Sequence, residues 1–218
     1  MYSIARIYSY LDEVWCVMLQ LQNNSDTVIL VLHEIYGINR HISGICNTLA
    51  DGKNDVLCPN LLLPNQTFNP GEEAEAYSNF MQNIGFNAAQ QQVEKLSREI
   101  QKDYKYRFII GFSIGATLAW LCSQQAGLYS GAVGFYGSRI RDYTNVVPKC
   151  PVLLFFPRWE DSFDVNHLIH ELSGKHNTSI VQVNALHGFS NPLSGTYCPE
   201  ASEAAITQAI TFFNRQKQ

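Results

Sequence analysis

A strand-like run, a glycine-flanked serine and a helix-favouring run follow one another in the middle of the chain. Residues 106–110 are rich in β-branched and aromatic side chains, residues 116–122 are apolar and helix-favouring, and Gly-Phe-Ser-Ile-Gly at 111–115 lies between them. This order predicts a strand, a sharp turn and a helix with Ser113 at the apex, because only glycine fits where strand and helix approach so closely. Such a turn exposes the serine hydroxyl and directs the N–H of Ile114 toward the same point.

The rest of the chain alternates in the same way between strand-like and helix-like segments. Alternation of this kind predicts an α/β fold with a mostly parallel sheet, helices on both faces, and functional groups at the carboxyl ends of the strands. The predicted strands are residues 14–21, 27–32, 55–59, 106–110, 131–136, 151–156 and 179–184, and the predicted helices are 39–51, 72–83, 87–103, 116–122, 165–172 and 199–213.

Composition narrows the class of protein further. The chain has 218 residues, of which 46% are hydrophobic, enough for one domain spanning 1–218 with a full core. A net charge of −4 without any basic run argues against nucleic-acid or anionic-membrane partners. The six cysteines are scattered without C-x-x-C spacing, and the N-terminus lacks a secretion-signal pattern. We therefore expect a cytoplasmic protein that needs no metal or other cofactor, either a monomer or a homodimer.

A nucleophilic serine needs a base to accept its proton and an acid to orient that base. In folds with this turn, the order along the chain is serine, acid, histidine. His187 follows the predicted strand 179–184 and precedes the last helix, whereas His167 and His170 fall inside a predicted helix and His176 precedes the strand. His187 is therefore the predicted base.

The acid is expected after the predicted strand 151–156. Glu160, Asp161 and Asp164 all lie there. Asp164 has the position of a helix N-cap, and Glu160 is close enough to Arg158 to form a solvent-exposed ion pair of little energetic value. Asp161 is therefore the preferred acid.

The oxyanion of an attacked carbonyl needs a second N–H donor besides that of Ile114. In this fold the loop after strand 27–32 supplies it, which makes the N–H of Ile35 the expected donor. The adjacent pair His33 and Glu34 does not indicate zinc, because no histidine stands three residues after Glu34.

Together these segments resemble the dienelactone hydrolase family of α/β-hydrolases. The resemblance rests on His-Glu-Ile-Tyr-Gly-Ile-Asn at 33–39, the turn at 111–115, Asp161, and His-Gly-Phe at 187–189, and it extends over residues 28–213. It implies an α/β-hydrolase fold, a hydrogen bond from Glu34 to the resting nucleophile, and donation from Ile35 to the oxyanion.

The sequence departs from that family at the nucleophile and in the substrate pocket. The namesake enzymes carry cysteine where this chain has Ser113, and a serine depends more strongly on its histidine for activation. They also grip the substrate carboxylate with two arginines. With Tyr77 and Phe80 as anchors, the first arginine falls at Glu73, and the second falls near Asn191, four residues after His187; neither residue is basic. A glutamate there repels an anionic substrate. Arg40 or Arg158 could replace them from nearby loops.

The substrate pocket is expected to be open and shallow, because the connection between residues 136 and 151 is too short for an inserted lid domain. Aromatic residues near the strand ends are candidates for its rim, although such residues are as often part of the core. With Glu73, Tyr77 and Asn191, the predicted pocket residues are Tyr36, Phe112, Tyr136, Trp159 and Phe189.

The leading hypothesis is a serine hydrolase that cleaves a small carboxylic ester, lactone or thioester through an acyl-enzyme. Two alternatives remain open at this stage. One is a catalytically silent binding or interaction protein of the same fold, because fold does not determine function. The other is a true dienelactone hydrolase (a carboxymethylenebutenolidase) that acts on a dicarboxylate.

Overall fold

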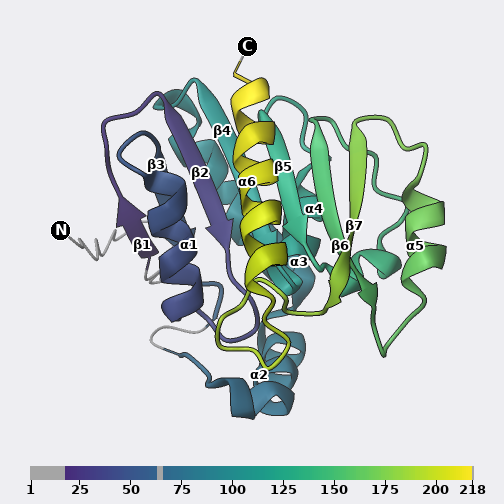
Figure 1. Ribbon diagram of the computed structural model, residues 1–218. Helices are drawn as coiled ribbons and strands as arrows, with labels where there is room; N and C mark the ends of the chain where they lie inside the picture. The colour runs from purple at the N-terminus through teal and green to yellow at the C-terminus, as the bar shows by residue number, and fades with distance from the viewer. Residues whose placement is uncertain (1–17, 63–65, 218) are drawn as a thin grey trace.

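The computed structural model describes residues 18–62 and 66–217, which form a sheet covered by helices on both faces (Figure 1). The strands are β1 (Met18–Leu21), β2 (Thr27–Leu32), β3 (Asp55–Pro59), β4 (Tyr106–Phe112), β5 (Gly131–Phe135), β6 (Val152–Trp159) and β7 (Thr178–Leu186). The α-helices are α1 (Arg40–Ala50), α2 (Glu73–Asn79), α3 (Gly85–Glu99), α4 (Ile114–Cys122), α5 (Val165–Leu172) and α6 (Pro199–Arg215). Short helical segments are η1 (Pro70–Glu72), η2 (Phe80–Ile84, a π-helix), η3 (Ile100–Lys102) and η4 (Ser138–Asp142).

The strands lie in the order β1-β3-β2-β4-β5-β6-β7, and all pairs are parallel except the antiparallel pair of β1 and β3. The carboxyl ends of the parallel strands therefore meet at one edge of the sheet, which is the end of the molecule where α2 lies (Figure 1). This confirms the predicted α/β architecture.

Two hydrophobic layers hold the helices to the sheet. One layer packs α1 and α6 against one face, and the other packs α3, α4 and α5 against the opposite face. Every residue of β2 is buried, as expected for a central strand that is covered on both sides. Among the described residues, no helix is both long and apolar enough to cross a lipid bilayer.

Most predicted segments are present, with differences at their ends. The strand predicted at 14–21 is seen as β1, and its first four residues lie outside the described part of the chain. β6 continues three residues beyond the predicted end at 156, because its pairing with β7 persists as far as Trp159 and Leu186. The helix predicted at 72–83 is divided into η1, α2 and the π-helix η2.

The turn between β4 and α4 has the strained geometry expected for an exposed nucleophile. Ser113 has φ 52° and ψ −112°, a conformation that costs a side-chain-bearing residue about 1–3 kcal/mol. A Cβ atom at Gly111 would lie 2.0 Å from the carbonyl oxygen of Gly115, and one at Gly115 would lie 2.3 Å from that of Leu32. Backbone atoms occupy the space on both sides, so both glycines are required sterically.

Replacing Gly115 with alanine should therefore destabilise the protein strongly. We expect a loss of about 3 kcal/mol or more, because strand, turn and helix would have to separate, which corresponds to a fall in Tm of about 6–12 °C. Gly44→Ala is the matched control, since Gly44 is exposed in α1 and a Cβ atom there meets nothing within 4 Å. That change should stabilise by about 0.5–1 kcal/mol. Thermal denaturation of both variants measures the difference, and equal Tm values would contradict the steric argument.

Candidate active site

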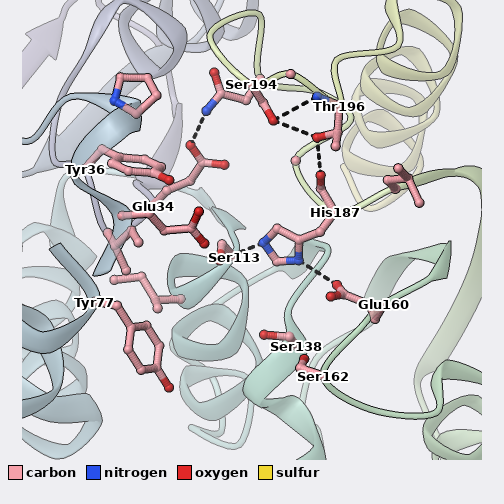
Figure 2. A pocket seen from close by; sticks show the side chains of 18 of the residues that line it. Glu34, Tyr36, Tyr77, Ser113, Ser138, Glu160, Ser162, His187, Ser194 and Thr196 are labelled. Carbon is pink, nitrogen blue, oxygen red and sulfur yellow. Dashed lines mark hydrogen bonds and ion pairs between the residues drawn. The ribbon is translucent and has the colours of Figure 1, made fainter. Parts of the chain in front are cut away.

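Ser113 and His187 come together at the carboxyl ends of β4 and β7. The N–H of Ser113 donates to the carbonyl of Phe135 at the end of β5, which ties the turn to the sheet. Its hydroxyl lies 3.2 Å from Nε2 of His187 (Figure 2). The carbonyl of His187 accepts a hydrogen bond from the hydroxyl of Thr196, which fixes the backbone behind the imidazole.

The other ring nitrogen of His187 is hydrogen-bonded to a carboxylate. Nδ1 is 2.6 Å from Oε1 of Glu160, which is almost completely buried. Burial lowers the pKa of His187, but the hydrogen bond and charge of Glu160 raise it, as do the charges of Glu34 and Glu73, so that the net pKa is above the ordinary 6.5. A carboxylate on Nδ1 holds the proton there and leaves Nε2 free to accept one from Ser113.

The prediction of Asp161 as the acid is therefore wrong by one position along the chain. Asp161 is exposed and lines the nearby cavity, whereas Glu160 contacts the imidazole. The cause is the length of β6: Trp159 is still paired with Leu186, so the next residues on the two strands, Glu160 and His187, leave the sheet side by side. Asp164 caps α5 as predicted, accepting from the N–H groups of Asn166 and His167.

The predicted oxyanion donors, Ile35 and Ile114, both line the same cavity as Ser113. The orientation of the Ile35 N–H is fixed by His33, which sequence reasoning did not assign a role. Nδ1–H of the buried His33 donates to the carbonyl of Glu34 at 2.6 Å, and its Nε2 accepts from the N–H of Leu61 at 2.8 Å. Because a trans peptide is planar, holding that carbonyl directs the Ile35 N–H to the opposite side. Burial lowers the pKa of His33 to about 4, so the ring is neutral at pH 7.

The carboxylate of Glu34 is buried and bound by other groups. It accepts from the hydroxyl of Tyr136 at 3.1 Å and from Nδ2 of Asn191 at 2.7 Å, and Nδ1 of His41 is 3.4 Å away. Burial, followed by the charge of Glu34, raises the pKa of Tyr136 well above 10, which keeps this hydroxyl protonated as a donor. Among the described residues, no hydrogen bond joins Glu34 to Ser113. The predicted contact of Glu34 with the nucleophile is therefore not present. Glu34 instead holds the side chains of Tyr136 and Asn191 in place.

The site opens into a cavity of about 500 Å³. Five of the predicted pocket residues line it: Tyr36, Glu73, Tyr77, Trp159 and Asn191. The other three, Phe112, Tyr136 and Phe189, are wrong as pocket residues, because they are fully buried in the hydrophobic layer beneath the site.

The charges around the cavity are predominantly negative. Glu34, Glu73, Glu160 and Asp161 line it, and the basic residue among its lining side chains is Arg139. Arg139 was not predicted; it is held 2.6 Å from Asp142 and donates to the hydroxyl of Tyr77. Neither Arg40 nor Arg158 lines the cavity, and the guanidinium of Arg158 lies over the ring of Trp159 instead. Burial and the charges of Glu73 and Glu34 raise the pKa of Tyr36 to about 12.

Most other lining residues lie in segments where little in the sequence indicated a site. Arg139 lies in η4, between β5 and β6, where no helix is predicted from the sequence. Leu186 precedes His187 at the end of β7, and Leu193, Ser194 and Thr196 belong to the loop between β7 and α6. A histidine followed by a long polar loop before the last helix was the one available hint.

The parallel sheet, the strained serine at the end of β4 and the histidine after the last strand define an α/β-hydrolase fold. Solved structures agree: a dienelactone hydrolase from Anabaena variabilis superimposes with a TM-score of 0.71 at 15% identity, covering 98% of both chains. A dienelactone hydrolase-like promiscuous phosphotriesterase from metagenomic libraries gives a TM-score of 0.76 at 16% identity, covering 94% of both.

The pattern of the dienelactone hydrolase family matches residues 16–217, and this chain belongs to that family of hydrolases. A relative from Bacillus subtilis (strain 168), the uncharacterized protein YczH, is 42% identical over 167 residues, which are 76% of this chain and 81% of the relative. The resemblance recognised in the sequence is confirmed.

Proposed function

We propose that this protein is a serine esterase that hydrolyses small carboxylic esters, lactones or thioesters through an acyl-enzyme on Ser113. The observation that carries the proposal is the continuous set of hydrogen bonds from Ser113 through His187 to Glu160 at the wall of an open cavity. The two hydrogen bonds join the nucleophile to the base and the base to the acid, as nucleophilic catalysis requires.

In the first half of the proposed reaction, Oγ of Ser113 bonds to the substrate carbonyl carbon while its proton moves to Nε2 of His187. The oxyanion that forms accepts from the N–H groups of Ile35 and Ile114. The carbon–oxygen bond to the alcohol then breaks, and His187 returns its proton to the leaving oxygen. Glu160 stabilises the imidazolium during this exchange.

In the second half, water replaces the alcohol. His187 accepts a proton from the water, whose oxygen bonds to the acyl carbon, and the same N–H groups stabilise the second oxyanion. The bond to Ser113 then breaks, the serine regains its proton, and the acid is released. Glu160, whose side chain is almost completely buried, keeps the imidazole oriented through both halves.

The cavity charges favour neutral or cationic acyl groups over anionic ones. Glu73 and Asp161 would repel a substrate carboxylate, and the guanidinium of Arg139 is already paired with Asp142. A lactone that carries a carboxylate, such as dienelactone, is therefore a disfavoured substrate.

Labelling with a fluorophosphonate tests the proposal directly. We expect one covalent adduct, which peptide mapping by mass spectrometry should locate on Ser113. Prior denaturation should abolish labelling, because an unactivated serine does not react. A folded protein that remains unlabelled, or that carries its adduct on another residue, would contradict the assignment.

A further inference from the structure

Large apolar side chains are exposed around the mouth of the cavity. Among the described residues, six such side chains are at least 38% exposed: Tyr77, Val147, Trp159, Leu186, Leu193 and Tyr197. Four of these six line the cavity, namely Tyr77, Trp159, Leu186 and Leu193. Exposed apolar residues that occur singly need no explanation, whereas a cluster at the entrance of a site indicates a surface that contacts a ligand.

Two members of this cluster are attached to the same strand ends as the acid and the base. Trp159 and Leu186 are paired in the register of β6 and β7, and they directly precede Glu160 and His187. They are 54% and 48% exposed. We call this pair the apolar platform. Its position relative to the imidazole is fixed by the strand pairing.

The chemistry of acylation determines which part of an ester lies on each side of Ser113. The oxyanion must accept from Ile35 and Ile114, and the leaving oxygen must come within hydrogen-bond reach of Nε2 of His187 to receive its proton. The alcohol portion therefore extends to the side of His187, where the apolar platform lies. The acyl portion therefore lies on the side of Ser113 opposite His187.

That remaining side has a different chemical character. Tyr36 and Tyr77 lie across Ser113 from His187 and Glu160 (Figure 2). Glu73 lines the same cavity and stands on α2 one helical turn before Tyr77, so the two side chains lie on the same face of that helix. Hydroxyl groups and a carboxylate suit a small polar acyl group without negative charge.

On the basis of the proposed function, we infer that this enzyme is selective for esters of bulky apolar alcohols, such as aryl or alicyclic alcohols, with a short uncharged acyl group. The apolar platform receives the alcohol. Because the alcohol departs when the acyl-enzyme forms, the platform acts on acylation and has no role in deacylation.

The test compares 2-naphthyl acetate with methyl acetate, which form the same acetyl-enzyme. The variants are Trp159→Ala and Leu186→Ala, with Val147→Ala as a control, since Val147 is 55% exposed but does not line the cavity. For each variant, kcat/KM relative to wild type is measured with both esters, which cancels the intrinsic reactivity of the alcohols. The deacylation rate is measured from the steady phase after a p-nitrophenyl acetate burst.

We expect Trp159→Ala to lower kcat/KM for 2-naphthyl acetate by about tenfold or more and that for methyl acetate by less than about twofold. Leu186→Ala should act in the same direction, Trp159→Phe should restore most of the loss, and deacylation should be unchanged in all of them. Equal losses with both esters, or slowed deacylation, would overturn the inference while leaving the serine esterase intact. A folded wild-type protein whose Ser113 is not labelled by the fluorophosphonate would instead overturn the proposed function itself.

Discussion

Ser113→Ala is expected to lower kcat/KM for p-nitrophenyl acetate by about four orders of magnitude or more. The reason is that, in the proposed mechanism, the hydroxyl 3.2 Å from His187 is the atom that bonds to the substrate. Steady-state hydrolysis measured against the uncatalysed rate gives the size of the loss.

Two controls make this result specific. The alanine variant should keep the wild-type Tm to within a few degrees, because Ser113 occupies a strained conformation that alanine does not make worse. Ser138→Ala is the matched serine control, since Ser138 also lines the cavity and, among the described residues, no hydrogen bond joins it to His187. A Ser113→Ala enzyme that retained more than a tenth of its activity would refute an acyl-enzyme at this residue.

Glu160→Gln should lower kcat/KM by about 10²–10⁴-fold, because an amide neither fixes the proton on Nδ1 nor stabilises the imidazolium. Asp161→Asn should lower it by less than about threefold, since the neighbouring carboxylate lines the cavity without contacting the ring. The two variants differ by one position along the chain and test the identity of the acid directly. The reverse ranking would restore Asp161 to that role.

The pH profile provides an independent readout of the same carboxylate. His187 accepts the serine proton only when it is neutral, so kcat/KM should rise with pH through the pKa of His187 and level off above it. Glu160 helps to raise that pKa above 6.5, which places the acidic limb of the wild-type profile above pH 6.5. In Glu160→Gln the residual activity should show this limb at lower pH. A limb that does not move would contradict the assigned contact.

The fold could be predicted because its signals are local. The glycine-flanked turn, the apolar run of β2 and the N-cap at Asp164 can each be recognised from a few consecutive residues, and the structure reproduces all three. Ser113 and His187 could be predicted for the same reason, because each stands at the end of a recognisable strand.

The acid and some of the pocket residues could not be predicted, because they depend on the pairing register between strands and on the direction in which side chains at strand ends point. Glu160 faces the imidazole because β6 and β7 stay paired up to Trp159, and nothing local in residues 157–164 indicates that extension. Likewise, Phe112 and Tyr136 stand at strand ends as expected, but their rings turn into the hydrophobic layer under the site. Which way a terminal side chain points depends on the packing around it.

The strand that carries His187 has a consequence for how this protein loses activity. In the part of the chain that the structure describes, β7 is one of the two edge strands of the sheet, β1 being the other, and only Ala185 of the nine residues of β7 is buried. Peripheral strands detach at lower free energy than central ones, in sub-global opening reactions. Detachment of β7 would carry the imidazole away while Ser113 stayed on the central strand β4. We therefore expect inactivation under mild denaturing stress to be a separate and earlier event than loss of the core, and to be reversible as long as that core persists.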